Sequence, residues 1–462
     1  MLAELAAAVR ERRISSEELV RRSLERIERL DGPIGAVIAL RADEASAEAR
    51  ALDARAAREP GALGPLAGIP LLVKDNEDVA GMRTTYGSLL FADVPPPDAD
   101  ALSVSRLRAA GAVVVGKTNL PELAFEGYTD NALFGPTRNP WSPAWSPGGS
   151  SGGSGAALAM GLAPIATATD GGGSVRIPAA FCGLVGLKPT NGLIARGPLP
   201  SWIDLSTSGP LATSTADARL LFDVLRGPAP GDPTALPAWS ARPRAVPRRL
   251  LAAPRFVDHG PLPADVDALF EAALTRLSDA LGLPVEPLEA APFDPRSDED
   301  WLLQCAVEEL AWLGRERVER EAERLTRVAT AILRIASAAT LDDYVAARRR
   351  RFAYARALDD LLAGDAVIAT PTMCVGSIAA DGRMPGAAHP GTGSEIYNTQ
   401  IQNLTGHPAI SLPVGSSSDG IPFGLQLTGP RFADDLLLAA AERWEAAEPW
   451  PRVAPGYEPF DA

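Results

Sequence analysis

Short apolar runs alternate with helical stretches along much of this chain, and no other feature constrains its fold as strongly. The run at 68–76 is followed by a helical stretch at about 99–110 and by a second apolar run at 112–116. The alternation continues through residues 154–190. Strands separated by helices form a largely parallel sheet with helices on both faces. We therefore predict an α/β fold in an α/β/α arrangement, with a large mixed and mostly parallel β-sheet.

The middle of the chain differs in composition from its two ends. Residues 227–249 are rich in Pro and Arg, so this connection cannot be a core element. A charged helical region follows, and strand-like runs resume only near the C-terminal end. We expect a single domain over 1–462, with a core of about 1–228 and 365–462 and with a linker and helical insertion at about 229–364.

Charge and cysteine content exclude several classes of protein. The chain has 44 Lys and Arg against 58 Asp and Glu, a net charge of −14, which excludes nucleic-acid binding by bulk charge. Cys182, Cys305 and Cys374 lack CxxC spacing, which speaks against a disulfide framework or a zinc site. The first residues lack the order of a signal peptide, and no run is apolar enough to span a membrane. We expect a cytoplasmic protein that binds neither nucleic acid nor membrane.

The segment from Ser146 to Thr190 carries the strongest chemical signal. It contains GGSSGGSG at 148–155 and DGGGS at 170–174, each at a junction between predicted elements. Glycine at this density permits left-handed backbone and presents N–H groups to an oxyanion. Hydroxyl-bearing glycine loops of this kind indicate acyl transfer by a serine.

A serine nucleophile needs a base, and the residues alone leave the choice open between a histidine and a lysine. Residues 148–152 and 149–153 both satisfy G-x-S-x-G, which with His407 would indicate an α/β-hydrolase. Any Gly/Ser tract yields that match, and no strong strand precedes it. Lys74 ends an apolar run and would serve as a base if burial kept it neutral.

Seven stretches of the chain, taken in order, resemble the amidase signature family. They span about 66–228 and 365 to the C-terminus with the order and spacing typical of that family, and the chain is most similar to its free-standing bacterial amidases, urethane-cleaving members included. The stretches are GIPLLVKDN, TTYGS, GAVVVGKTNLPELA, FGPTRNPW, the Ser146–Thr190 segment, NLTGHPAISLPVG and GIPFGLQLTGP.

The resemblance implies an amidase signature fold and a Ser-cisSer-Lys triad. Lys74 in VKDN matches the family's lysine, Ser150 in GGSSGG matches the bridging serine, and Ser174 in DGGGS matches the nucleophile. The implied oxyanion hole consists of the backbone N–H groups of Gly171, Gly172, Gly173 and Ser174. No metal or organic cofactor is implied, because the chain itself supplies nucleophile, relay and oxyanion donors.

The resemblance also implies how the triad is held. The peptide bond between Gly149 and Ser150 is expected to be cis, and Ser151, Asp170 and Arg176 match positions that support the triad. The chain departs from the family at Gly172, where Thr or Ile is usual, which implies a more flexible loop. Ala124 falls where the family offers a backbone carbonyl to the substrate.

Family members differ in the substrate pocket, so we chose pocket candidates because they flank the matched motifs. If these residues line the pocket, the substrate is apolar or aromatic, and we expect hydrolysis of small aryl or alkyl amides. They are Ala124, Phe125, Tyr128, Trp202, Ile203, Tyr397 and Gln400.

Other activities remain open for the same triad. Carbamates (urethanes) and esters undergo the same acyl chemistry. A glutamine-hydrolysing subunit of an aminoacyl-tRNA amidotransferase is disfavoured, because residues 118–131 differ from that subunit's usual block. A catalytically silent assembly subunit is disfavoured because all three triad residues are present. The expected partner is a small amide or carbamate substrate, and homodimerisation is an expectation from the family only.

Overall fold

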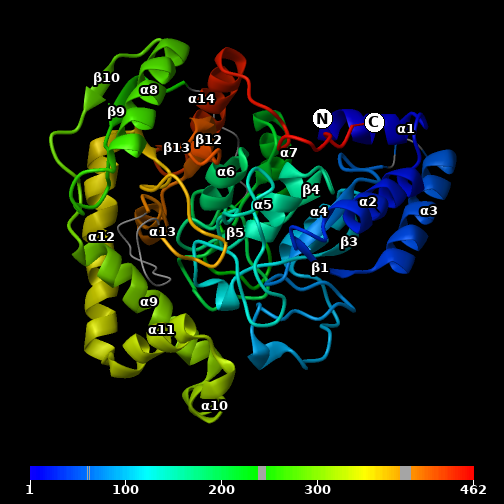
Figure 1. The fold of residues 1–462 in the computed structure, drawn as a ribbon, viewed down its shortest axis with the longest axis horizontal. Coiled ribbons are helices and arrows are strands. Elements are labelled where there is room, and N and C mark those ends of the chain that lie inside the picture. The colour runs from blue at the N-terminus through cyan, green and yellow to red at the C-terminus, as the bar shows by residue number, and fades with distance from the viewer. Residues whose placement is uncertain (60, 62, 238–245, 385–396, 462) are drawn as a thin grey trace.

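The computed structural model describes residues 1–59, 61, 63–237, 246–384 and 397–461, and its sheets are flanked by many helices (Figure 1). The α-helices of this part are α1 Leu2–Arg10, α2 Ser16–Leu30, α3 Ala42–Arg58, α4 Leu102–Ala109, α5 Gly152–Ala159, α6 Arg176–Cys182, α7 Thr215–Leu225, α8 Ala264–Leu281, α9 Arg296–Leu313, α10 Arg315–Arg320, α11 Arg327–Ala338, α12 Leu341–Leu362, α13 Gln400–Thr405 and α14 Asp434–Ala447. The strands are β1 Val37–Leu40, β2 Pro70–Lys74, β3 Val113–Thr118, β4 Ile165–Ala166, β5 Thr169–Asp170, β6 Val185–Lys188, β7 Thr207–Ser208, β8 Leu211–Ala212, β9 Arg249–Ala252, β10 Val285–Pro287, β11 Ala366–Pro371, β12 Ala409–Ser416 and β13 Pro422–Thr428.

The strands confirm an α/β fold with a large mixed sheet. A seven-stranded sheet has the order β10-β9-β11-β13-β12-β6-β8, a four-stranded sheet has the order β1-β3-β2-β4, and β5 pairs with β7. Parallel pairing joins β2 to β3 and β4, and β9 to β10 and β11, while the other described pairs are antiparallel. The large sheet is therefore less parallel than predicted, since β13 pairs antiparallel with β11 and β12, and β6 pairs antiparallel with β12 and β8.

The large sheet extends into the range 229–364, which we expected to hold only a linker and helices. Strands β9 and β10 lie in this range and pair in parallel with each other, and β9 pairs with β11. Their four and three residues are too few to show a period in the sequence. Residues 238–245 of the predicted linker lie outside the described residues.

Helices cover both faces of the large sheet, as the alternation along β13 shows. Phe423 and Leu425 lie in the main core with residues of α8 and α14. Gly424 and Gln426 point to the other face, where Gln426 accepts a hydrogen bond from Arg176 at the start of α6. A Cβ at position 424 would lie 2.7 Å from the backbone of α6, so glycine there lets α6 approach the sheet closely.

Helices α9, α11 and α12 form a layer at one side of the molecule, drawn in green to yellow (Figure 1). Apolar residues of α9 and α11, among them Leu310 and Ile332, form a cluster with Leu90 and Phe91, whereas Leu358 of α12 belongs to a different cluster. Within the described residues, no helix is long and apolar enough to cross a membrane. The layer lies against the glycine loops described below and so forms one wall of the candidate site.

Candidate active site

Lys74 is the last residue of β2, and each of the five residues of this strand is buried. Its Nζ lies 2.8 Å from Ser150 Oγ and 2.9 Å from Thr169 Oγ1. Burial lowers the pKa of Lys74 from 10.5 to about 7, against the opposing effect of the carboxylates of Glu77 and Asp170. Near neutral pH a large share of Lys74 is therefore the neutral amine, which is able to accept a proton.

Ser150 lies directly before α5, and the peptide bond that precedes it is cis, as the resemblance implied. Its side chain is buried, and its hydroxyl oxygen accepts the hydrogen bond from Lys74. The neighbouring Ser151 hydroxyl donates a long hydrogen bond of 3.4 Å to the carbonyl oxygen of Thr169. The lysine and its hydroxyl partners thus converge from β2, β5 and the turn before α5.

Ser174 lies two residues before α6 and is 9% exposed. Together with Ser150 it lines a small cavity of mixed polarity, and it also lines a larger, mostly apolar cavity. Within the described residues, its hydroxyl makes no hydrogen bond, so it faces the cavities without a competing partner. This is the position that a nucleophile requires.

An ion pair between Asp170 and Arg176 fixes the loop that carries Ser174. Both side chains are fully buried, and two Arg176 nitrogens lie 2.8 and 2.9 Å from the carboxylate. Although burial raises the pKa of Asp170, Arg176 lowers it to about 2. Arg176 also donates to Gln402, Gln426 and Asn403. The loop is therefore tied to the helix and to the sheet behind it.

The amide groups of the DGGGS loop are not all available to an oxyanion. The Gly173 N–H donates to Asp170 Oδ1 at 2.8 Å, which removes it from the four donors that we predicted. The N–H groups of Gly171, Gly172 and Ser174 donate to no atom of the described residues. These three amides are therefore the available donors of the loop.

A side chain from another element packs against Gly172. The ring of Trp301 occupies the space that a residue-172 side chain would take, since a Cβ there would lie 2.3 Å from Trp301 Cζ2. Trp301 Nε1 donates to the Gly171 carbonyl at 2.9 Å, and Thr399 Oγ1 donates to the Gly172 carbonyl at 2.6 Å. These contacts hold a loop that the glycine alone would leave flexible.

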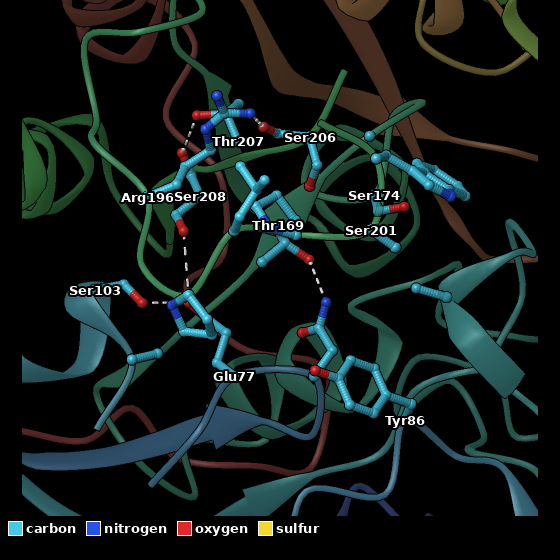
Figure 2. A pocket seen from close by; sticks show the side chains of 18 of the residues that line it. Glu77, Tyr86, Ser103, Thr169, Ser174, Arg196, Ser201, Ser206, Thr207 and Ser208 are labelled. Atoms are coloured by element: carbon cyan, nitrogen blue, oxygen red, sulfur yellow. Dashed lines mark hydrogen bonds between the residues drawn. The ribbon is translucent and has the colours of Figure 1, made fainter. Parts of the chain in front are cut away.

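The cavities on the two sides of Ser174 differ in size and chemistry. The larger one, of about 420 Å³, lies between the glycine loops and helices α9 and α11 and is mostly apolar. The smaller one, of about 110 Å³, is lined both by apolar residues and by hydroxyl, carboxyl and amide side chains, several of which Figure 2 labels. Ala124 lines both cavities with a left-handed φ of +59°, which is strained for alanine and typical of functional sites.

Most of the pocket residues predicted from flanking motifs lie where we expected them. Those that line the large cavity are Ala124, Phe125, Trp202, Tyr397 and Gln400. Tyr128 does not, because its ring packs in a separate core cluster with Ile177 and Met373. Ile203 lines neither cavity; its side chain is partly exposed, and its backbone N–H binds Glu308.

The wall formed by α9 and α11 was missed by sequence reasoning. Trp301, Leu302 and Cys305 of α9 line the large cavity together with Ile332 and Ile335 of α11. Trp301 and Cys305 are four residues apart and share a helix face. That apolar face was visible in the sequence, but it equally predicts ordinary core packing.

His407 is excluded as the base by its surroundings. It is fully buried, and its ring nitrogens lie 2.9 Å from Thr405 Oγ1 and 3.1 Å from Asp359 Oδ1. Burial lowers its pKa to about 4. His407 lines neither cavity beside Ser174, so the α/β-hydrolase alternative lacks its histidine.

Comparisons with known proteins agree with this geometry. The family model described as Amidase matches residues 18–438. A glutamyl-tRNA(Gln) amidotransferase subunit of Aromatoleum aromaticum is 38% identical over 491 residues, with 97% of each chain covered. A bacterial aryl acylamidase of the amidase signature family has a similar structure, with a TM-score of 0.86 at 26% identity over 97% of this chain and 96% of that one. For 6-aminohexanoate cyclic dimer hydrolase the TM-score is 0.84 at 31% identity over 98% of both chains. This chain therefore belongs to the amidase signature family of hydrolases, which act on amide bonds.

Proposed function

We propose that this protein hydrolyses the C–N bond of small aryl or alkyl amides through an acyl-enzyme on Ser174. The observation that carries the proposal is the 2.8 Å contact between Lys74 Nζ and Ser150 Oγ in a fully buried site. The lysine there has hydroxyl partners rather than a bonded carboxylate, so burial favours its neutral form. The exposed edge of Ser174 on the cavity wall supplies the nucleophile.

Acylation follows from these positions. The neutral amine of Lys74 accepts the proton of Ser150, Ser150 accepts that of Ser174, and Ser174 Oγ attacks the carbonyl carbon. The amides of Gly171, Gly172 and Ser174 stabilise the oxyanion, at about 3–4 kcal/mol for each donor. The proton then returns through Ser150 to the nitrogen, the C–N bond breaks and the amine leaves. Water hydrolyses the acyl-enzyme by the same route.

The large cavity supports the choice of substrate. Its aromatic and aliphatic lining and its volume of about 420 Å³ fit an aryl or alkyl acyl group. Carbamates and esters present the same carbonyl to Ser174, so urethane or ester hydrolysis by the same triad is the nearest extension of the proposal.

A specific observation favours glutamine hydrolysis as a second candidate. The similar amidotransferase chain covers this one almost end to end. Glu126 and Arg327 also line the large cavity. The carboxyl of Glu126 could bind the ammonium group of glutamine, and the guanidinium of Arg327 could bind its carboxylate. Arg327, however, is exposed, and most of the remaining lining is apolar, so amides with apolar acyl groups remain the better fit.

The test is a substrate panel with three variants. An aryl anilide, an aliphatic amide, an aryl carbamate and L-glutamine are assayed with the wild type and with Ser174→Ala, Lys74→Ala and His407→Ala. We expect the anilide or the aliphatic amide to be cleaved fastest, the serine and lysine variants to be inactive, and the histidine variant to retain turnover.

Each other outcome is informative. Loss in His407→Ala with turnover in Lys74→Ala would contradict the lysine base. Fastest turnover of L-glutamine would favour the second candidate. An inactive wild type with every substrate would favour a silent assembly subunit.

A further inference from the structure

The two cavities beside Ser174 are not equivalent with respect to the proton relay. Ser150 and Thr169, the bonded partners of Lys74, both line the small cavity. Neither lines the large apolar cavity. The proton that Ser150 returns to the leaving nitrogen is therefore delivered on the side of the small cavity.

This asymmetry assigns the two halves of the substrate. The nitrogen of the scissile bond must be protonated before the bond breaks, so it has to lie within reach of Ser150. The leaving amine then occupies the small cavity, and the acyl group occupies the large one. This step rests on the proposed function.

Glu77 gives the small cavity a buried carboxyl group. Its Oε1 accepts hydrogen bonds from Ser103 Oγ and, at 3.5 Å, from Ser208 Oγ, and in the view of Figure 2 these three side chains lie together on the side away from Ser174. Its Oε2 is buried without a hydrogen-bond partner, although the Thr167 hydroxyl lies beside the carboxyl, and burial raises the pKa of Glu77. A buried oxygen without a partner is costly, which points to a donor that binds there.

Glu309 of α9 gives the same cavity a second buried carboxyl group. It is 2% exposed, and its Oε2 also lacks a hydrogen-bond partner. Ser201 and Trp202 lie beside this carboxyl without bonding Oε2, and burial raises its pKa to about 7. A cation bound beside it would favour the ionised form.

Arg196 is the positively charged residue that lines this cavity, and its guanidinium already has other partners. The Arg196 guanidinium binds the backbone oxygens of Ile203 and Ser206, Thr234 Oγ1, and the Asp232 carboxylate at 3.5 Å. It therefore binds neither glutamate, and Lys74 and Lys117, whose charges favour the ionised form of Glu77, hydrogen-bond other groups. The rings of Tyr86 and Trp312 also line the cavity, with centroids 5.1 Å apart, and aromatic faces attract cations.

We propose that the small cavity selects a leaving amine that carries a second, protonated nitrogen, which binds Glu77 and Glu309. The substrate class is thus the mono-acyl amide of a short diamine. The volume of about 110 Å³ corresponds to roughly four water-sized groups, which fits the chain of ethylenediamine. The large cavity takes the apolar acyl group of the same substrate.

The experiment compares two amides that share a 3-phenylpropanoyl group. One is the N-(2-aminoethyl) amide and the other is the N-propyl amide, which replaces the ammonium by a methyl group of similar size. The ratio of their kcat/KM values is measured for the wild type, Glu77→Gln, Glu309→Gln and Glu44→Gln, whose glutamate is exposed on α3. Using a ratio removes the effect of any variant that is partly unfolded.

We expect the wild type and Glu44→Gln to prefer the aminoethyl amide by about tenfold, which is about 1.4 kcal/mol at 25 °C. The preference should fall to near unity in at least one of the cavity variants. A wild-type ratio near one would mean that the cavity holds water only, and would overturn the proposal. A ratio that both variants retain would overturn it as well.

Failure of the proposed function gives a different result. In that case neither amide is hydrolysed by the wild type, or Ser174→Ala hydrolyses them equally well. Ethylenediamine and propylamine are also tested as inhibitors of wild-type hydrolysis of the N-propyl amide. Stronger inhibition by the diamine supports the proposal, and equal inhibition opposes it.

Discussion

Lys74 and Lys117 lie on neighbouring parallel strands, are both fully buried, and differ in the partner of the ammonium group. Strand β2 ends at Lys74. Lys117 of β3 pairs with Val73, the residue before Lys74. Lys117 Nζ lies 3.0 Å from the Asp75 carboxylate, whereas Lys74 Nζ contacts hydroxyl groups. Burial lowers the pKa of both, but Asp75 opposes this at Lys117. The partner, not the burial, thus separates the proposed base Lys74 from Lys117, which belongs to an ion pair.

The strand period explains why Asp75 pairs with the more distant lysine. Successive side chains of an extended chain point to opposite faces, so Asp75 turns away from Lys74 and toward the face of Val73 and Lys117. Lys74 shares its face with Thr118, whose hydroxyl bonds Ser154 of α5. The sequence pair Lys-Asp at 74–75 therefore supplies one residue to the active site and one to the ion pair.

The largest expected effect is the loss of activity when Lys74 is replaced. Lys74→Met keeps the volume and removes the base, so kcat/KM should fall by about 10⁴-fold or more, as for the loss of other triad members. The free energy of unfolding should fall by less than in Lys117→Met, because Lys74 hydrogen-bonds hydroxyl groups and no carboxylate. Amide hydrolysis and urea unfolding measure the two effects. Residual activity within tenfold of the wild type would break the comparison.

Lys117→Met should show the opposite pattern. It leaves the Asp75 carboxylate buried without a cation, which typically costs about 3–5 kcal/mol of stability. Adding Asp75→Asn removes the unpaired charge and should restore much of this loss. Urea unfolding of the single and double variants measures it. If Lys117→Met were as stable as the wild type, the ion pair would not be what keeps Lys117 distinct from Lys74.

The residues that the sequence singled out as catalytic lie beside one another in the structure. Lys74, Ser150 and Ser174 each lie in a short motif in which neighbouring glycines or strand residues determine the backbone. The amide of Gly173 was assigned wrongly as an oxyanion donor, because its bond to Asp170 depends on a side-chain orientation that spacing does not reveal.

The substrate half was less predictable because it is built from distant segments. Trp301 and Glu309 reach the site from α9, more than a hundred residues after the DGGGS loop, and no motif accompanies them. Glu77 lies inside a matched region, yet its burial beside the cavity follows from the packing of Ser103 and Ser208 around it. Such contacts follow from tertiary packing and leave no period in the sequence.

A substitution at Trp301 tests the contribution of the DGGGS loop to catalysis separately from that of Lys74. Trp301→Phe removes the hydrogen bond to Gly171 but keeps a ring against Gly172, so kcat should fall by about tenfold through misplaced oxyanion donors. The pH dependence should stay that of Lys74. Trp141→Phe is the matched control, because it removes an equivalent indole bond, to Cys182, away from both cavities. An equal fall of kcat in both variants would indicate a general packing effect.

The smallest expected effect concerns the pH profile, which reports the lysine directly. Lys74 must be neutral to accept a proton, so kcat/KM for the N-propyl amide should fall tenfold per pH unit below about pH 7 and level off above it. The Glu77 carboxylate stabilises the ammonium form of Lys74 and raises its pKa. Glu77→Gln should therefore move the acidic limb to lower pH, whereas Glu44→Gln should leave it in place. A limb that moves to higher pH, or does not move, would contradict an ionised Glu77 beside Lys74 and would leave the bonded partner of each ammonium group as the whole difference between Lys74 and Lys117.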